Sequence, residues 1–323
     1  MARYLHSIAV NSRVVVVDTV DRFDLPVNPL SHLLIRLNFL NNGINTKATM
    51  GNIAAAIDRL EVLFKGNAVL SLNGSDMLAY GSLINGHGLR QSNVVNTDNA
   101  VRSYTILVPF GRRLFNPTEC FPATDRGNLQ LSIDWATALT NLDTITVQIE
   151  AVELPEARPQ QFMRATTLSL TPTATGDQDI QIPVGNILRA IMIFGTTIPT
   201  GIITTATIGN TRLLADGNSI YVDQIGHEVL HALWGLGRDL ADDYDDHIHL
   251  ENTAAAYTQN ADTAAAEQDD GFLSQYSLID FDPTGDGMYL FNSAGLGELK
   301  VRINAGNTSA LRVLPIELVK VAA

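Results

Sequence analysis

The sequence predicts an all-β protein built from two tandem β-sandwiches. Short runs of Val, Ile, Leu and Thr alternate with polar residues between Gly, Asn, Asp and Pro, which is the pattern of strands that bury one face. Several features of the first half return in the same order in the second half. With 323 residues, of which 46% are hydrophobic and 17% charged, the chain is long and apolar enough to form two cores.

A hairpin is the clearest strand pair of the first half. Apolar residues alternate over 60–64, the turn-like Lys65-Gly66-Asn67 follows, and the alternation resumes over 68–72 before Asn73-Gly74. Similar patterns predict further strands at 14–17, 129–133, 145–149, 187–194 and 299–303. We expect helix chiefly between about Gln224 and Ala266, which is rich in Ala, Leu and Asp.

Five matches between the halves occur in the same order along the chain. The most specific one relates Gly66-Asn67-x-x-Leu70-x-x-Asn73-Gly74 to Gly209-Asn210-x-x-Leu213-x-x-Asp216-Gly217. The others are Leu25-Pro26-Val27 with Ile182-Pro183-Val184, Tyr104 with Tyr276, Gly127 with Gly297, and Ile149 with Ile316. Ordered matches whose offsets drift are what two copies of one sandwich with unequal loops leave. We therefore predict a duplication.

The second copy carries an insertion. Thirty positions separate Gly74 from Tyr104 and 59 separate Gly217 from Tyr276, so the second copy is 29 residues longer here. The segment from about 226 to 271 holds eleven carboxylates and one basic residue, Arg238. We expect a mostly helical, solvent-exposed projection, because so much charge is costly to bury.

Two prolines, Pro155 and Pro159, interrupt the strand pattern and mark the seam between the copies. The resulting division is an N-terminal arm at 1–12, a first sandwich at 13–155, a linker at 156–165 and a second sandwich at 166–323.

Charge and cysteine content exclude several classes of protein. The 34 acidic and 21 basic residues give a net charge of −13, which repels phosphate backbones and argues against nucleic-acid binding as the main activity. The single cysteine, Cys120, cannot form an intramolecular disulfide, and we expect an inert buried thiol. No apolar run reaches the ~18 residues of a membrane-spanning helix, so we expect a protein that is soluble when made.

This organisation resembles the double jelly-roll major capsid proteins of tailless icosahedral viruses, many of which enclose a membrane. The residues that carry the resemblance are Asp24 to Leu30, the hairpin end Leu70 to Gly74 with its copy at Asp216-Gly217, Gly297 to Ile303, and Val313 to Leu318. The resemblance implies two jelly rolls per chain and a homotrimer whose six sandwiches form a pseudo-hexameric tile. It implies no catalytic residue, no cofactor and no metal.

The same resemblance implies a location in the virion shell after synthesis in the host cytoplasm. The main partner is the chain itself, with minor capsid or vertex proteins and an internal membrane as further candidates and no sequence-specific contact to nucleic acid. We expect the arm, which carries Arg3 and His6, to lie beneath the tile against a neighbour or anionic lipid. The acidic insertion is expected on the outer face.

One motif favours an alternative function, zinc-dependent hydrolysis. His227-Glu228-Val229-Leu230-His231 fits H-E-x-x-H, in which two histidines one helical turn apart bind zinc and the glutamate polarises a water. Glu251 would be a possible third ligand. An extended metzincin pattern fails, because Trp234 and Gly237 stand where Gly and His are needed.

The competing interpretation of this segment is an amphipathic helix without metal. Val229, Leu230, Leu233 and Trp234 would face the core, and His227 and Glu228 would be solvated. The first copy has Asn85 to Gly88 at the corresponding place, with no similar group of side chains. We therefore expect no catalytic zinc.

The remaining candidates are weaker. The segment Asp280 to Gly287 begins like a calcium loop, but Thr284 and Phe291 stand at positions that need carboxylate or amide ligands, so we expect a β-turn. His247 and His249, near Asp242 to Asp246, could recruit a divalent ion or titrate near pH 6.5, but a hydrated loop is the simpler interpretation. A carbohydrate-binding or adhesion module is a further alternative. Glycan-binding surfaces usually display aromatic side chains, and aromatic residues make up only 7% of this chain.

Overall fold

The computed structural model describes residues 3–42, 50–85, 91–94, 98–199, 205–235, 247–253, 256–259 and 272–321. They divide into two compact units. The first comprises the described residues up to Met163 together with those between Asp239 and Phe272, and the second comprises those of Arg164–Arg238 and from Leu273 onward. The change from one unit to the other lies within the linker expected at 156–165.

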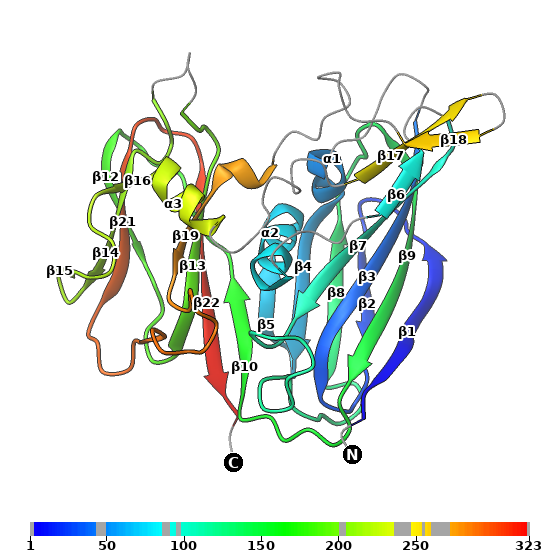
Figure 1. The fold of residues 1–323 in the computed structure, drawn as a ribbon, viewed down its shortest axis with the longest axis horizontal. Helices are drawn as coiled ribbons and strands as arrows, with labels where there is room; N and C mark the ends of the chain where they lie inside the picture. Colours follow the sequence, from blue (N-terminus) through cyan, green and yellow to red (C-terminus); the bar gives the residue numbers. More distant parts are fainter. Residues whose placement is uncertain are drawn as a thin grey trace. The chain divides into compact units, whose positions relative to one another are not determined.

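The first unit contains two sets of four antiparallel strands, each set belonging to a different sheet (Figure 1). One has the order β1 (Leu5–Val14), β9 (Leu142–Glu153), β3 (Leu30–Asn41) and β7 (Val101–Pro109). In the other, β5 (Asn67–Leu72), β4 (Ile57–Phe64), β8 (Leu129–Trp135) and β2 (Val20–Asp24) pair in that order. Helix α1 (Met50–Ala55) precedes β4, and helix α2 (Gly74–Asn85) follows β5.

The second unit repeats this arrangement. Its first sheet pairs β11 (Leu168–Leu170), β22 (Leu311–Lys320), β13 (Ile187–Gly195) and β19 (Tyr276–Asp280). Its second sheet pairs β12 (Gly176–Gln181), β21 (Leu299–Ala305), β14 (Asn210–Ala215) and β15 (Asn218–Ser219). The short strands β16 (Ile225–Gly226) and β20 (Phe291–Asn292) pair with β14 and β13, and β10 (Gln161–Thr166) precedes β11.

The duplication is confirmed at the level of topology. If the eight sandwich strands of each unit are numbered along the chain, both units have one sheet in the order 1-8-3-6 and another in the order 5-4-7-2. Eight antiparallel strands in two such sheets form a jelly roll. The expected all-β fold with two tandem jelly rolls is therefore present.

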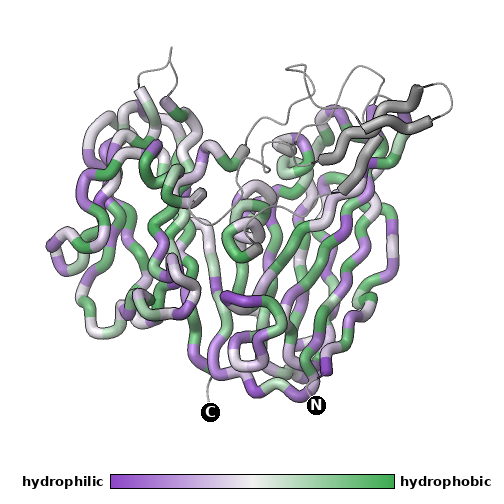
Figure 2. The backbone as a smooth tube through the Cα atoms, viewed as in Figure 1, coloured by the Kyte–Doolittle hydropathy of each residue, from purple (hydrophilic) through white to green (hydrophobic). Residues whose placement is uncertain are grey.

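Side-chain alternation builds the two cores, as the sequence predicted. In β3, Leu33, Ile35, Leu37 and Phe39 are fully buried while the residues between them are more exposed or polar. In the second unit, β21 buries Leu299, Val301 and Ile303 in the same way. Figure 2 shows the hydropathy of each residue along the backbone of these strands.

The match of residues 66–74 with residues 209–217, described above as the most specific, is wrong, because it relates strands that do not correspond in the two units. Lys65-Gly66 joins β4 to β5 with φ values of 49° and 81°, and Asp216-Gly217 joins β14 to β15 with φ values of 47° and 81°. Two positive φ values are the signature of a two-residue hairpin turn. Gly66 therefore corresponds to Gly217, not to Gly209. The other four matches relate corresponding strands.

The corrected pairing shortens the insertion. Gly66 and Tyr104 are 38 positions apart and Gly217 and Tyr276 are 59 apart, so the excess is 21 residues and not 29. A helix also occupies this connection in the first unit, where α2 follows β5, just as α3 (His227–Trp234) follows β15 and β16. Helix is thus not confined to the second copy.

The described remainder of the insertion is not helical, which corrects the expectation for 226–271. β17 (His247–Thr253) and β18 (Ala256–Gln259) form an antiparallel pair, and β17 runs parallel to β6 (Gln91–Val94). β6 belongs to the connection that follows α2. The corresponding connections of the two halves therefore meet in one three-stranded sheet. A short 3-10 helix, η2 (Phe272–Gln275), leads from the insertion into β19.

The predicted N-terminal arm is wrong for residues 5–12. These residues form most of β1, which pairs with β9 from Leu5 opposite Glu153 to Val14 opposite Thr146. None of the helices in the described part of the chain is long and apolar enough to cross a membrane.

Candidate functional site

The H-E-x-x-H segment forms α3, and both of its histidines point inward. His227 is only 4% exposed; its Nε2 donates to the Ser274 carbonyl at 3.0 Å, and its Nδ1 lies 2.7 Å from the Ser277 hydroxyl. In a neutral ring this makes Nδ1 the acceptor of the serine proton. His231 donates from Nδ1 to the Tyr276 carbonyl at 2.9 Å. The two rings therefore attach α3 to η2 and β19.

This geometry disfavours a zinc site. A ligating histidine offers the metal an unprotonated ring nitrogen, but both nitrogens of His227 are already in hydrogen bonds within the protein. Burial lowers the pKa of His227, so the neutral form persists. Among the described residues, no group of three His, Cys, Asp or Glu side chains is placed to hold a metal. The side chain of Glu251 lies outside the described part.

The buried face of α3 differs from the expectation. His227, Leu230 and Trp234 are buried, whereas Val229 and Leu233 are about half exposed. The helix is rotated toward its histidine side because the hydrogen bonds to η2 and β19 lie there. Val229 and Leu233 are left at the surface.

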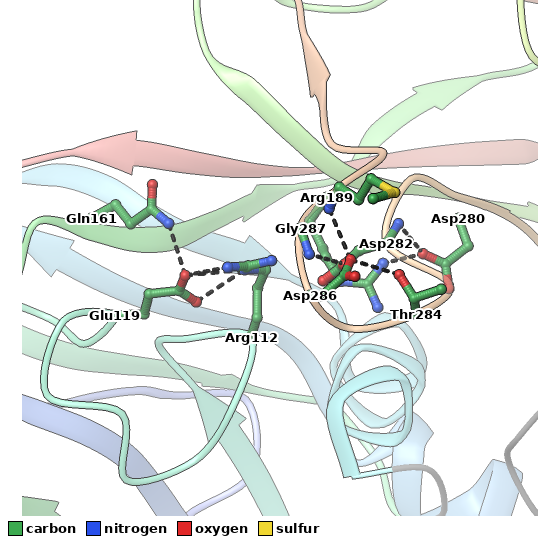
Figure 3. A network of polar contacts seen from close by, with 10 residues as sticks. Arg112, Glu119, Gln161, Arg189, Asp280, Asp282, Thr284, Asp286 and Gly287 are labelled. Carbon is green, nitrogen blue, oxygen red and sulfur yellow. Dashed lines mark hydrogen bonds and ion pairs between the residues drawn. The ribbon is translucent and has the colours of Figure 1, made fainter.

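The segment from Asp280 to Gly287 folds around the side chain of Arg189 (Figure 3). Arg189 of β13, 5% exposed, donates to the Asp280 carboxylate, and its Nε lies 3.6 Å from Oδ2 of the buried Asp282. Asp282 Oδ1 accepts the backbone N–H of Gly287 at 2.7 Å. Asp286 Oδ1 accepts the Thr284 hydroxyl at 2.7 Å. The guanidinium thus offsets one of the negative charges that a bound cation would otherwise have to offset.

A second buried network lies in the first unit (Figure 3). Arg112 Nε donates to both oxygens of Glu119, at 3.1 and 3.0 Å, and Gln161 Nε2 donates to Oε1 at 2.8 Å. Burial by itself raises the pKa of Glu119, but these hydrogen bonds outweigh burial and the pKa is lowered. The adjacent Cys120 is buried, and burial raises its pKa to about 11, as befits an inert thiol.

His32, which the sequence analysis did not single out, is a buried histidine whose pKa is strongly lowered. It is 4% exposed, and its Nδ1 lies 2.9 Å from the Ser31 hydroxyl, which itself accepts the backbone N–H of Phe115 at 2.8 Å. The rings of His32 and Phe115 meet edge to face at 5.2 Å. Burial, with a smaller contribution from His6, lowers the pKa of His32 to about 4.

The other sequence candidates cannot be placed. Asp242 to Asp246 lie outside the described residues, and the side chains of His247 and His249 are not described although their backbone forms part of β17.

Comparison with known proteins finds matches in structure but not in sequence. No protein-family model matches this sequence, and neither does any curated protein. The structure matches the major capsid protein P2 of bacteriophage PM2 at a TM-score of 0.59 and 12% identity, over 100% of this chain and 98% of that one. It matches the STIV major capsid protein at 0.66 and 13%, over 98% and 97%. It matches the PBCV-1 virus capsid at 0.60 and 9%, over 98% and 94%.

The fold is the double jelly roll. Within it, α3 occupies the same place as α2, between the fifth and sixth strands of its jelly roll. α2 is attached to its sixth strand, β7, by the Tyr80 hydroxyl, which donates to the Pro109 carbonyl at 2.9 Å. The histidines of α3 therefore perform in one jelly roll the anchoring that a tyrosine performs in the other. Both histidines thus have a structural role in the described part of the chain.

Corresponding carboxylates also secure the last strand of each jelly roll. Glu153 of β9 accepts the Asn28 amide at 2.8 Å, and Glu317 of β22 accepts the Asn186 amide at 2.9 Å. Arg164 Nε donates a further bond to Glu317 at 2.8 Å. Both carboxylates are buried, so these polar groups serve the fold itself.

Proposed function

We propose that this chain is a major capsid protein that assembles as pseudo-hexameric trimers into the shell of an icosahedral virus. The observation that supports this most is the match of the whole duplicated fold, over at least 94% of both chains, to three proteins whose titles name a capsid or a major capsid protein. Two jelly rolls per chain produce a sixfold-like tile when three copies close a ring.

The polar side chains that suggested catalysis support the same proposal. His227 and His231 hold a helix to a strand, and Asp280 and Asp282 both lie in ion-pair distance of Arg189. Each of these groups has a partner within the fold, and a group that is already fully engaged is poorly suited to bind substrate. A structural protein is the function class that such an arrangement favours over a zinc-dependent hydrolase.

Location and further partners follow from this proposal. The protein would reside in the virion shell after synthesis in the host cytoplasm, with minor capsid or vertex proteins and an internal membrane as candidate neighbours. The acidic insertion, which carries eleven carboxylates, would face outward, because lipid phosphates or genome on the inner side would repel it. The net charge of −13 opposes direct packaging contacts with nucleic acid.

The test is the mass of the purified protein at micromolar concentration, followed by negative-stain microscopy. We expect three copies per particle in solution and pseudo-hexagonal tiles or closed shells in the images. A stable monomer that forms no particles under any assembly condition would contradict the proposal.

A further inference from the structure

One end of the first jelly roll, which we call the basal end, consists of connections that meet beside the N-terminus (Figure 1). The start of β1 lies there, together with the connections β2–β3, β4–β5, β7–β8 and β9–β10. Backbone hydrogen bonds join these connections to one another, from Lys65 to Asn128, from Thr124 to Val27 and from Leu154 to Pro29. The basal end comprises residues 3–4, 25–29, 65–66, 110–128 and 154–160.

The basal end is basic, although the chain as a whole is acidic. It holds six basic and three acidic residues, a net charge of +3, and since the whole chain carries −13, the rest of it carries −16. The basic residues are Arg3, Lys65, Arg112, Arg113, Arg126 and Arg158, and the acidic residues are Glu119, Asp125 and Glu156.

Ion pairs within the basal end leave most of this basic charge at the surface. Arg112 pairs with Glu119, and Arg3 pairs with Glu156. Asp24 and Glu153, at the neighbouring strand ends, each accept a side-chain amide. The other charged residues of the basal end are all exposed, and they are Lys65, Arg113, Arg126 and Arg158 on the basic side and Asp125 on the acidic side.

The opposite end of the same jelly roll has the reverse charge. The described residues of its connections include Asp18, Asp76 and Asp98 and no basic residue. β17 of the acidic insertion pairs with β6 in one of these connections. The charge of the first jelly roll is therefore polarised along its strands.

The basic character does not belong to the fold in general. In the second jelly roll the connections β12–β13, β14–β15 and β19–β21 are the equivalent ones, and they contain no basic residue. Their charged residues are Asp216, Asp282, Asp286 and Glu298. A basic end is thus a property of the first jelly roll alone.

The basal end also exposes apolar and aromatic side chains. Tyr4 is 65% and Phe115 48% exposed, and their rings meet edge to face at 5.2 Å. Val27 is 42% exposed. Phe115 has a φ of 62°, which a bulky residue rarely adopts, and its backbone N–H donates to the Ser31 hydroxyl at 2.8 Å. A strained backbone that keeps a phenyl ring half exposed points to a partner outside the chain.

An anionic lipid bilayer matches both properties of the basal end. Its phosphates attract Lys and Arg, and aromatic side chains settle at the boundary between headgroups and acyl chains. A nucleic-acid duplex offers the phosphates but no apolar phase for Val27 and Phe115. Screening limits attraction and repulsion between exposed charges to about 8 Å at physiological salt, so the acidic remainder of the chain does not prevent the contact.

We propose that the basal end binds an anionic lipid bilayer, with its exposed basic residues on the lipid phosphates and Tyr4 and Phe115 inserted at the boundary with the acyl chains. This inference rests on the proposed function, in which an internal membrane is a candidate neighbour of the shell, and it assigns that contact to named residues. Binding to lipid is nevertheless measurable without assembly.

Sedimentation of the full chain with vesicles tests the charge. We expect binding to vesicles of equal parts phosphatidylglycerol and phosphatidylcholine and little binding to phosphatidylcholine alone. Loss of one basic residue at an anionic surface costs about fivefold, so Arg126→Glu and Arg158→Glu should each weaken binding at least tenfold. Arg36→Glu is the matched control, because Arg36 is exposed in the middle of β3, about 20 Å from the basal end at ~3.3 Å per residue.

Tryptophan fluorescence tests the insertion. Both natural tryptophans, Trp135 and Trp234, are buried, so a new surface tryptophan reports separately. In the Phe115→Trp variant, anionic vesicles with brominated acyl chains should quench the added fluorescence. The Val101→Trp variant is the control, because Val101 is 55% exposed at the opposite end of the same jelly roll, and its fluorescence should not change. Thermal melting verifies that each variant folds.

The inference is overturned by any of four results: wild-type protein does not bind the anionic vesicles, binds pure phosphatidylcholine equally well, is weakened as much by Arg36→Glu as by Arg126→Glu, or shows no quenching as Phe115→Trp. It is also overturned if a DNA duplex at equal phosphate concentration displaces the protein from the vesicles, because the basal end would then recognise phosphates in general.

Assembly, measured without lipid, separates this inference from the proposed function. If wild-type protein forms trimers but does not bind vesicles, this inference falls and the capsid proposal stands. If it binds vesicles as described but remains a monomer that forms no particles, the capsid proposal falls and the lipid-binding surface stands.

Discussion

Acid should destabilise this protein through His32 between pH 6.5 and pH 4. In the unfolded chain the imidazole titrates near its ordinary value of 6.5, and in the native protein burial lowers the pKa to about 4. In this interval the unfolded chain binds a proton that the native protein does not bind. The free energy of unfolding is therefore fully retained above pH 6.5 and falls as the pH falls toward 4.

The magnitude follows from the size of the shift. Each pKa unit is worth about 1.4 kcal/mol, so a shift from 6.5 to about 4 corresponds to a loss of about 3 kcal/mol on acidification. That is a large fraction of the 5–15 kcal/mol that is typical of a folded domain. Protonation would also place a charge beneath the Phe115 ring, where the Ser31 hydroxyl is the hydrogen-bond partner that the structure provides.

The assay is urea unfolding followed by tryptophan fluorescence at pH 7, 5.5 and 4.5, because Trp135 and Trp234 are both fully buried. His32→Gln keeps a polar side chain that does not titrate, so its stability should depend on pH less than that of the wild type by most of the 3 kcal/mol. His6→Gln removes only the smaller of the two contributions to the pKa shift of His32, so it should change the pH dependence much less than His32→Gln does. If His32→Gln loses as much stability on acidification as the wild type, the attribution to His32 is wrong.

Three further predictions concern the buried networks and the insertion. Arg189→Met should cost about 3–5 kcal/mol of unfolding free energy, because it removes the guanidinium charge beside the buried carboxylate of Asp282. Arg302→Met, at an exposed ion pair, should change the thermal midpoint little, and equal effects of the two substitutions would contradict this. Protein purified without chelator should hold well under one zinc per chain. His231→Ala should lower the melting temperature without changing the metal content. If the wild type holds one zinc per chain and this variant loses it, the hydrolase interpretation is restored. Limited proteolysis of intact particles should cleave between about Asp239 and Asp270 with the shell still closed, and protection in particles but not in free trimers would place the insertion inside or between tiles.

Local sequence patterns were sufficient to predict the strands and the duplication, but not to align the residues of one copy with those of the other. Asn73-Gly74 and Asp216-Gly217 look alike in sequence, yet they do different things. Asn73 caps α2, with its Oδ1 accepting the backbone N–H of Asp76 at 2.8 Å, whereas Asp216-Gly217 forms a hairpin turn. Both roles favour a short polar side chain followed by glycine. The dipeptide alone therefore does not reveal which of them the chain adopts.

Tertiary contacts explain two errors in the predicted secondary structure: helix α2 was not predicted, and strands β17 and β18 were predicted as helix. α2 escaped prediction because it is buried on nearly all sides, from Met77 to Leu83, and so shows no polar stripe of helical period. β17 and β18 were expected to be helical because Ala-rich segments have high helix propensity. They form strands instead because β6, more than 150 residues earlier in the sequence, offers a partner edge to β17. A single-sequence pattern contains neither piece of information.

The duplication supplies an internal comparison that favours a structural role for the H-E-x-x-H segment. If the histidines of α3 served catalysis, α2 in the first jelly roll would still need its own means of attachment. The two helices would then share only their position in the fold. Instead both are held to the sixth strand by polar side chains: Tyr80 bonds the Pro109 carbonyl of β7, His227 bonds the Ser277 hydroxyl of β19, and His231 bonds the Tyr276 carbonyl of β19. The requirement common to both halves is an anchored helix, because an unattached helix at this connection would leave the end of the core open. A histidine pair one turn apart meets that requirement as well as a tyrosine does, since the spacing that allows two side chains to bind one metal also allows them to bind one strand.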